Sequence, residues 1–168
     1  MLLYLFIYKA IVKLFVKFQG NEDDEWAIGT GWLIAPNMIV TAGHCAFDWA
    51  YNLGHAKSIK AYIGYSGQTS VGNPGVEFRW GKHVAVPAEW LKNPTENYDM
   101  ALIRVESDFK DVTPMNFRNT PVRTVQGKQA TLGVVGYPAD RTEGEYMYEH
   151  FRKVCGSVYH GVPKPDLS

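Results

Sequence analysis

Short apolar runs alternate with turn-forming residues along this 168-residue chain. Turn chemistry such as Pro36–Asn37 and the Gly-Asn-Pro-Gly sequence of Gly72–Gly75 separates the runs. No segment shows the sustained 3.6-residue periodicity of a helical protein. This spacing indicates an all-β barrel or sandwich. We predict strands over residues 10–18, 26–35, 38–42, 59–64, 82–86, 100–105, 130–136 and 146–154.

The first of these runs has a competing interpretation. Lysines recur every four residues from Lys9 to Lys17 and would line one face of an amphipathic helix. The β-branched and aromatic residues of 10–18 favour a strand, which we prefer, and 1–9 is left unassigned. The apolar run 1–8 lacks both the preceding positive charge and the small-residue cleavage site of a clear secretory signal. The lysines that follow argue against a membrane-spanning helix.

Composition narrows the function classes. The chain has 17 basic and 17 acidic side chains and a pI near 7.0, so we expect no nucleic-acid partner. Cys45 and Cys155 are too few for a disulfide framework, and their spacing is not that of metal ligands. The sequence allows either two free thiols at Cys45 and Cys155 or a single disulfide between them. The sequence leaves the oligomeric state open.

The segment Thr41–Cys45 carries the most specific chemistry. Its sequence, Thr-Ala-Gly-His-Cys, follows an apolar run and places His44 on a turn between small residues. Asp99 heads a second apolar run 55 residues later. A partly buried carboxylate needs a hydrogen-bonding partner, and a histidine that accepts a proton from a nucleophile needs a carboxylate to fix its tautomer. The two segments could therefore pair with each other.

These residues also carry a family resemblance. In order, Gly29–Ile34 (GTGWLI), Thr41–Cys45 (TAGHC) and Tyr98–Ile103 (YDMALI) resemble the trypsin-like serine endopeptidases of the chymotrypsin superfamily. The segments 133–140 and 147–149 are similar to its glutamyl-endopeptidase-like branch. The resemblance runs from about residue 10 to about residue 149.

The resemblance implies a chymotrypsin-like double β-barrel with the catalytic groups between the barrels. It implies that His44 is the general base and Asp99 its orienting partner. It also implies peptide or protein substrates and an extracellular, secreted protein. It implies neither a metal nor an organic cofactor. Cleavage after Glu would follow from the branch likeness alone.

The chain departs from this family at the nucleophile. The family's Gly-[Asp/Asn]-Ser-Gly-[Gly/Ser] segment does not occur, and only six serines are present. We interpret Ser66 as a turn residue, and Ser157 lacks the following glycine. We therefore expect a chain truncated before the nucleophile, with no oxyanion hole and no peptidase activity of its own. The alternative is a non-catalytic pseudo-protease or binding remnant of the same fold.

The resemblance and a polar stretch at 106–128 suggest the domain division. We expect a complete first barrel over 10–110, a partial second barrel over 120–155, and unassigned ends at 1–9 and 156–168. Six predicted strands precede the stretch and one or two follow it. Without covering strands, the run 130–136 would be a template for association, so we also expect poor solubility.

We expect the remaining candidate residues to have structural roles and to take no part in chemistry. Related chains commonly bridge the cysteine at the position of Cys45 to one in the preceding strand, but 26–35 holds none, so a buried thiol is expected. A zinc site built from His44, Cys45 and His55 matches no familiar spacing. The acidic run Glu22–Glu25 is expected to form a solvated hairpin turn. The histidines outside the motif are expected on the surface: His55, His83, His150 and His160.

Overall fold

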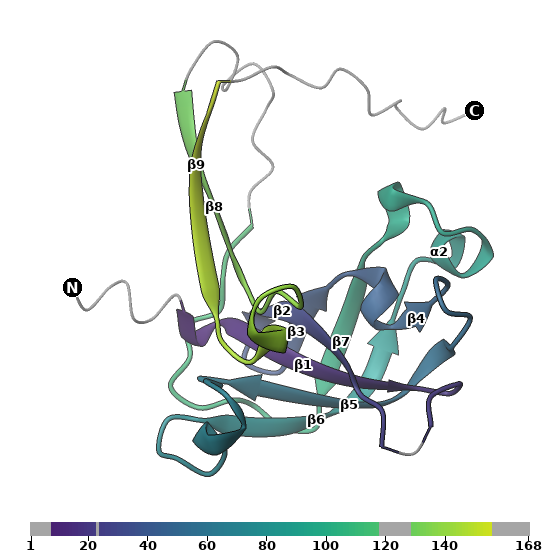
Figure 1. Cartoon of the computed structure of the whole chain (residues 1–168), viewed down its shortest axis with the longest axis horizontal. Helices are drawn as coiled ribbons and strands as arrows, with labels where there is room; N and C mark the ends of the chain where they lie inside the picture. The colour runs from purple at the N-terminus through teal and green to yellow at the C-terminus, as the bar shows by residue number, and fades with distance from the viewer. Residues whose placement is uncertain (1–7, 23, 118–128, 156–168) are drawn as a thin grey trace. The chain divides into compact units, whose positions relative to one another are not determined.

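The computed structural model describes residues 8–22, 24–117 and 129–155 (Figure 1). These residues fall into two compact units. The larger unit holds the described residues up to Asn116 together with Val135–Tyr148. The smaller unit holds the described residues of Phe117–Val134 and those from Glu149 onward.

The larger unit contains a closed β-barrel. Every strand pairing in it is antiparallel, in the order β1-β2-β3-β7-β6-β5, and a further pairing of β1 with β5 closes the ring. A short seventh strand, β4, pairs with β5. The strands are β1 Ile11–Phe18, β2 Ala27–Ala35, β3 Met38–Thr41, β4 Phe47–Asp48, β5 Gly54–Ile63, β6 Glu77–Ala85 and β7 Ala101–Val105.

Alternation along the strands builds the barrel core. On β1, Val12, Leu14 and Val16 are at most 1% exposed and face the interior. Side chains of a strand alternate between its two faces, so every second residue of β1 reaches the core of the closed sheet. The other strands and the chain after β7 complete this cluster with Leu33, Ile39, Ile59, Ala61, Ile63, Ile103, Val105 and Phe109.

The first strand settles the ambiguity in the sequence. β1 spans Ile11–Phe18, so the strand prediction is confirmed and the amphipathic helix is wrong. The spacing of the lysines does not decide the conformation of this segment. Val12, Leu14 and Val16 all face the core, and side chains two residues apart share a face in a strand but not in a helix. Residues 19–26 join β1 to β2, and the acidic side chains Glu22, Asp24 and Glu25 are exposed there, as expected.

Two strands are longer than predicted. β5 begins at Gly54 and β6 at Glu77, because their first halves alternate polar and apolar residues and lack a continuous apolar signal. The helical elements are short: α2 Ala88–Lys92 and the 3-10 turns η1 Gly43–Cys45, η2 Gln68–Ser70, η3 Glu96–Tyr98 and η5 Thr142–Gly144. None of the helices in the described ranges is long and apolar enough to cross a membrane.

Two further strands, β8 (Gln129–Gly136) and β9 (Tyr148–Cys155), form a separate two-stranded sheet. The all-β class with a complete first barrel and a partial second sheet is therefore confirmed. The domain boundaries at 110 and 120 stay predictions, and residues 118–128 and 156–168 lie outside the described part of the chain.

The two-stranded sheet exposes large apolar side chains. Val134 is 72% exposed and Leu132 is 56% exposed, both on β8. Phe151 on β9 is 50% exposed. Apolar strands with unpaired edges associate readily, since each edge offers free backbone donors and acceptors.

We predict that the 168-residue chain self-associates in a concentration-dependent way and that Val134→Lys reduces this association. Light scattering after gel filtration measures it, and Val71→Lys, an exposed valine beside η2 (41% exposed), is the matched control. A wild-type chain that stays monomeric at high micromolar concentration would contradict the prediction.

Candidate active site

Strand register brings the two predicted residues together. β3 pairs with β7 so that Thr41, the last residue of β3, lies opposite Ala101, the first residue of β7. His44 lies three residues beyond Thr41 in η1, and Asp99 lies two residues before Ala101. Both side chains therefore leave the barrel at the same end of one strand pair, although 55 residues separate them in sequence.

Asp99 holds His44 through two hydrogen bonds. The backbone N–H of His44 donates to Asp99 Oδ1 over 2.8 Å, and His44 Nδ1 lies 2.9 Å from Asp99 Oδ2. The Asp99 side chain is 27% exposed, whereas that of His44 is 62% exposed. A carboxylate that accepts from Nδ1–H fixes the tautomer and leaves Nε2 free to exchange a proton with another group.

Close packing behind the histidine explains the glycine of the motif. A Cβ on Gly43 would lie 3.0 Å from the Met100 backbone nitrogen and 3.1 Å from both Asp99 Oδ1 and the Trp90 ring. Trp90, on α2, is 5% exposed and donates its indole N–H to the carbonyl of Phe47 over 3.2 Å. No motif in the sequence around Trp90 predicted this support, and its only signal is a large aromatic residue between Glu89 and Leu91.

The surroundings of His44 favour its charged form. Hydrogen bonding with the Cys45 side chain, the larger cause, and with the Asp99 carboxylate raises the pKa of His44 to about 9. Partial burial opposes this rise. A stabilised imidazolium is what a general base requires once it has accepted a proton.

Cys45 is a free, buried thiol, as expected. Its Sγ lies 2.8 Å from the position that a Cβ would take on Gly29, in the neighbouring strand β2. The Cys45 Cβ lies 3.8 Å from the same position, which is the mean Cβ separation in a disulfide. The side chain of Cys155 lies outside the described residues.

The other candidates lie elsewhere. Ser66 is in the loop after β5, where its backbone N–H donates to Ser70 Oγ over 2.9 Å. Ser157 and His160 fall outside the described part of the chain, whereas the remaining histidines are exposed: His55, His83 and His150. Within the described ranges, no group of three or more His, Cys, Asp or Glu side chains is placed to hold a metal ion.

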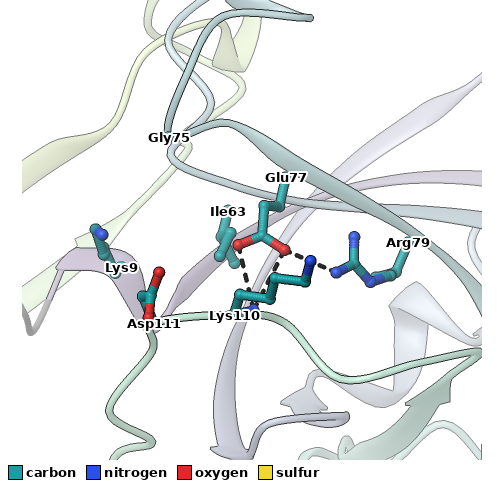
Figure 2. A pocket seen from close by; sticks show the side chains of 7 residues that line it. All are labelled: Lys9, Ile63, Gly75, Glu77, Arg79, Lys110 and Asp111. Atoms are coloured by element: carbon teal, nitrogen blue, oxygen red, sulfur yellow. Dashed lines mark hydrogen bonds and ion pairs between the residues drawn. The ribbon is translucent and has the colours of Figure 1, made fainter.

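Away from His44, a cavity of about 390 Å³ opens beside β6 (Figure 2). The Glu77 carboxylate in its lining already has partners: Arg79 Nη2 donates to it over 2.7 Å and the backbone N–H of Lys110 over 3.2 Å. The described residues that line it, Lys9 and Asp111 among them, include no histidine, serine or cysteine. The candidate chemistry therefore stays at His44.

Comparison with known proteins identifies the family of this chain. Residues 12–159 match the pattern of the family described as Trypsin, and the fold is that of the chymotrypsin-like proteases. The chain belongs to the trypsin family of serine proteases.

Individual relatives are distant in sequence. An extracellular metalloprotease of Bacillus subtilis (strain 168) is 29% identical over 140 residues, and a glutamyl endopeptidase of Bacillus licheniformis is 27% identical over 119 residues. These alignments cover 83% and 68% of this chain but only 42% and 34% of the relatives, so the chain spans less than half of either relative.

Solved structures show the same fold. A Glu endopeptidase in complex with MPD is 24% identical with a TM-score of 0.67, covering 90% of this chain and 64% of that one. The HL collagenase is 19% identical with a TM-score of 0.61, covering 87% and 58%.

We predict that Asp99→Asn lowers stability by about 0.5–1 kcal/mol at pH 6, a range for a partly exposed ion pair. The raised pKa of His44 means that its charged form contributes stability fully below pH 6.5 and loses that contribution as the pH rises through about 9. Urea unfolding at pH 6 and pH 10 should therefore show a gap between wild type and variant that shrinks at the higher pH. A gap that is constant or grows would contradict the pairing.

We also predict that Gly29→Cys forms a disulfide with Cys45 in oxidising buffer, because the Cβ separation already fits. Closing this loop of roughly 15 residues should stabilise the barrel by about 3 kcal/mol. Thiol titration and thermal unfolding with and without reductant measure both effects. Gly20→Cys, whose added Cβ meets Leu53 and no sulfur, is the control. Oxidised Gly29→Cys should keep one titratable thiol, that of Cys155, and three titratable thiols would refute the geometry.

Proposed function

We propose that this chain supplies the histidine and aspartate of a serine endopeptidase that acts on peptide or protein substrates. His44 is the general base and Asp99 orients it. The observation that carries the proposal is the double hydrogen bond between them, at 2.8 and 2.9 Å. Membership of the trypsin family supports proteolysis as the reaction.

Each residue has a defined part in the chemistry. Nε2 of His44 takes the proton of a serine hydroxyl as that oxygen attacks the scissile carbonyl, and then gives the proton to the leaving amine. Asp99 keeps the proton of the neutral imidazole on Nδ1 and stabilises the imidazolium between the two transfers. The exposure of His44 supports this role, because a substrate and a nucleophile both have to reach Nε2.

The lack of a nucleophile segment limits the chemistry that these 168 residues can perform alone. No Gly-[Asp/Asn]-Ser-Gly segment occurs in the sequence, and Ser66 lies in a loop bonded to Ser70. Without a serine beside Nε2 there is no acyl-enzyme, and we propose that the chain alone does not hydrolyse peptides. The second candidate function, a non-catalytic binding module, is favoured by this same combination of a formed His–Asp pair and a missing nucleophile segment.

Location and specificity are further parts of the proposal. The Bacillus subtilis relative is named extracellular, which supports a secreted protein. The Bacillus licheniformis relative is named a glutamyl endopeptidase, which supports cleavage after Glu by the complete enzyme.

A fluorophosphonate probe tests the missing nucleophile directly, because it labels activated serines. We expect no labelling of the 168-residue chain and no hydrolysis of fluorogenic peptides above that of His44→Ala. Labelling of any serine in wild type but not in His44→Ala would overturn the proposed inactivity and identify the nucleophile.

The roles of His44 and Asp99 need a separate test. Sequencing the transcript beyond the codon for Ser168 shows whether a Gly-[Asp/Asn]-Ser-Gly segment follows. If it does, Asp99→Asn in the longer protein should lower kcat by about 10⁴-fold. A loss of less than tenfold would refute the assigned role of Asp99. A genuine stop codon would leave the binding module as the function.

A further inference from the structure

A lysine is completely buried against the outside of the first barrel. Lys13 lies on β1 between Val12 and Leu14, whose side chains face the core, so its own side chain faces the other way. It is nevertheless 0% exposed. Lysine is among the residues that are least often buried, because removing its charge from water is costly.

The segment that covers Lys13 comes from the connection between β8 and β9. Lys13 Nζ donates to the carbonyl of Gly144 over 2.7 Å. The ring centroids of Phe15 and Tyr137 lie 4.9 and 5.4 Å from Nζ. We refer to residues Tyr137–Met147 as the cover segment; all of them belong to the same compact unit as the barrel.

Hydrogen bonds at both ends fix the cover segment to the barrel. Near its start, the backbone N–H of Tyr137 donates to Thr30 Oγ1 over 2.8 Å, and its hydroxyl donates to the carbonyl of Tyr65 over 3.0 Å. Near its end, the Glu145 carboxylate accepts from the Tyr65 hydroxyl over 3.1 Å and from the backbone N–H of Gln68 over 2.8 Å.

The turn above Lys13, residues 142–144, packs tightly against the barrel. Thr142, Glu143 and Gly144 all have positive φ, at 45, 52 and 70°. A Cβ on Gly144 would overlap Ile28 Cδ1 and would lie 2.7 Å from Lys13 Nζ. Backbone of this kind persists only where the surroundings hold it in place, so the Lys13 contact and the turn conformation depend on each other.

The buried amine is only partly compensated when it is charged. An ammonium has three N–H donors, and the described residues provide Lys13 with one hydrogen-bond acceptor, the Gly144 carbonyl. Burial lowers the pKa of Lys13 to about 8, and the negative charge of Glu145 opposes this. The other titratable groups nearby are the hydroxyls of Tyr65 and Tyr137, whose pKa values burial raises far above the ordinary range, so they stay neutral.

We propose that Lys13 makes the docking of the cover segment onto the barrel depend on pH. The segment docks most firmly over the neutral amine. When Lys13 takes up a proton, local opening becomes easier, because the open state lets the ammonium reach water. Lys13 is thus a positioning residue for the connection between β8 and β9, and its action does not depend on the proposed hydrolysis.

The direction and size of the pH effect on opening follow from the difference in the pKa of Lys13 between the docked and open states. The open state binds the proton with the ordinary pKa of 10.5 and the docked state with a pKa of about 8. The open state therefore holds more protons between these values, and opening becomes rarer as the pH rises. With these two values, the opening constant should fall about tenfold between pH 7 and pH 9.

Hydrogen exchange of the wild-type chain at pH 7 and pH 9 tests this without any substitution. After correction for intrinsic exchange, peptides covering 137–147 should show the tenfold fall in opening. They should also open more often than peptides from β3 and β7, which marks the opening as local. Equal opening at both pH values would overturn the proposal, and so would exchange that matches the barrel strands.

The variant Lys13→Met tests whether the amine of Lys13 causes the change of opening with pH. Methionine keeps the length of the chain without the charge, so the opening of 137–147 should no longer change with pH and should be rarer than in wild type at pH 7. Lys60→Met is the matched control: Lys60 lies on the neighbouring strand β5 opposite Phe15, is partly exposed, and has its Nζ 4.1 Å from the Trp26 ring. A pH response that survives in Lys13→Met would refute the role of Lys13.

Discussion

The pairing of β1 with β5 is the constraint on which the rest of the structure depends. β1 already pairs with β2, and the second pairing, in which Val12 lies opposite Ile63, closes six strands into a ring. Closure leaves the barrel without a free edge and puts every second side chain of β1 into the core. It also sends the intervening residues, Lys13 among them, to the outer face.

The closed barrel fixes the positions of His44 and Asp99 relative to each other. The β3–β7 register fixes Thr41 opposite Ala101, and the short turns beyond these residues carry His44 and Asp99. A shift of one residue in this register would move Asp99 along the strand pair relative to the imidazole by about 3.3 Å, the rise of one strand residue. Gly43 then allows the close approach that the two hydrogen bonds require.

Much of this arrangement could be predicted from the sequence, because its signals are local. The β-branched and aromatic residues of β1 and the Thr-Ala-Gly-His-Cys turn are both visible in a few adjacent residues. The burial of Lys13 and the support from Trp90 could not be predicted, because each depends on residues far along the chain. The first halves of β5 and β6 were also missed, because Gly54–Ser58 and Glu77–Gly81 contain no continuous apolar run.

The central claim is that Asp99 pairs with His44 and fixes its tautomer, at a site in a chain of the trypsin family whose surroundings favour the charged imidazole. Nitrogen NMR of the imidazole from pH 5 to pH 11, with His44→Gln used to assign the signal, tests it most directly. The account predicts a pKa near 9 and a neutral form with its proton on Nδ1. A pKa at or below 6.5, or a neutral form with its proton on Nε2, would contradict it.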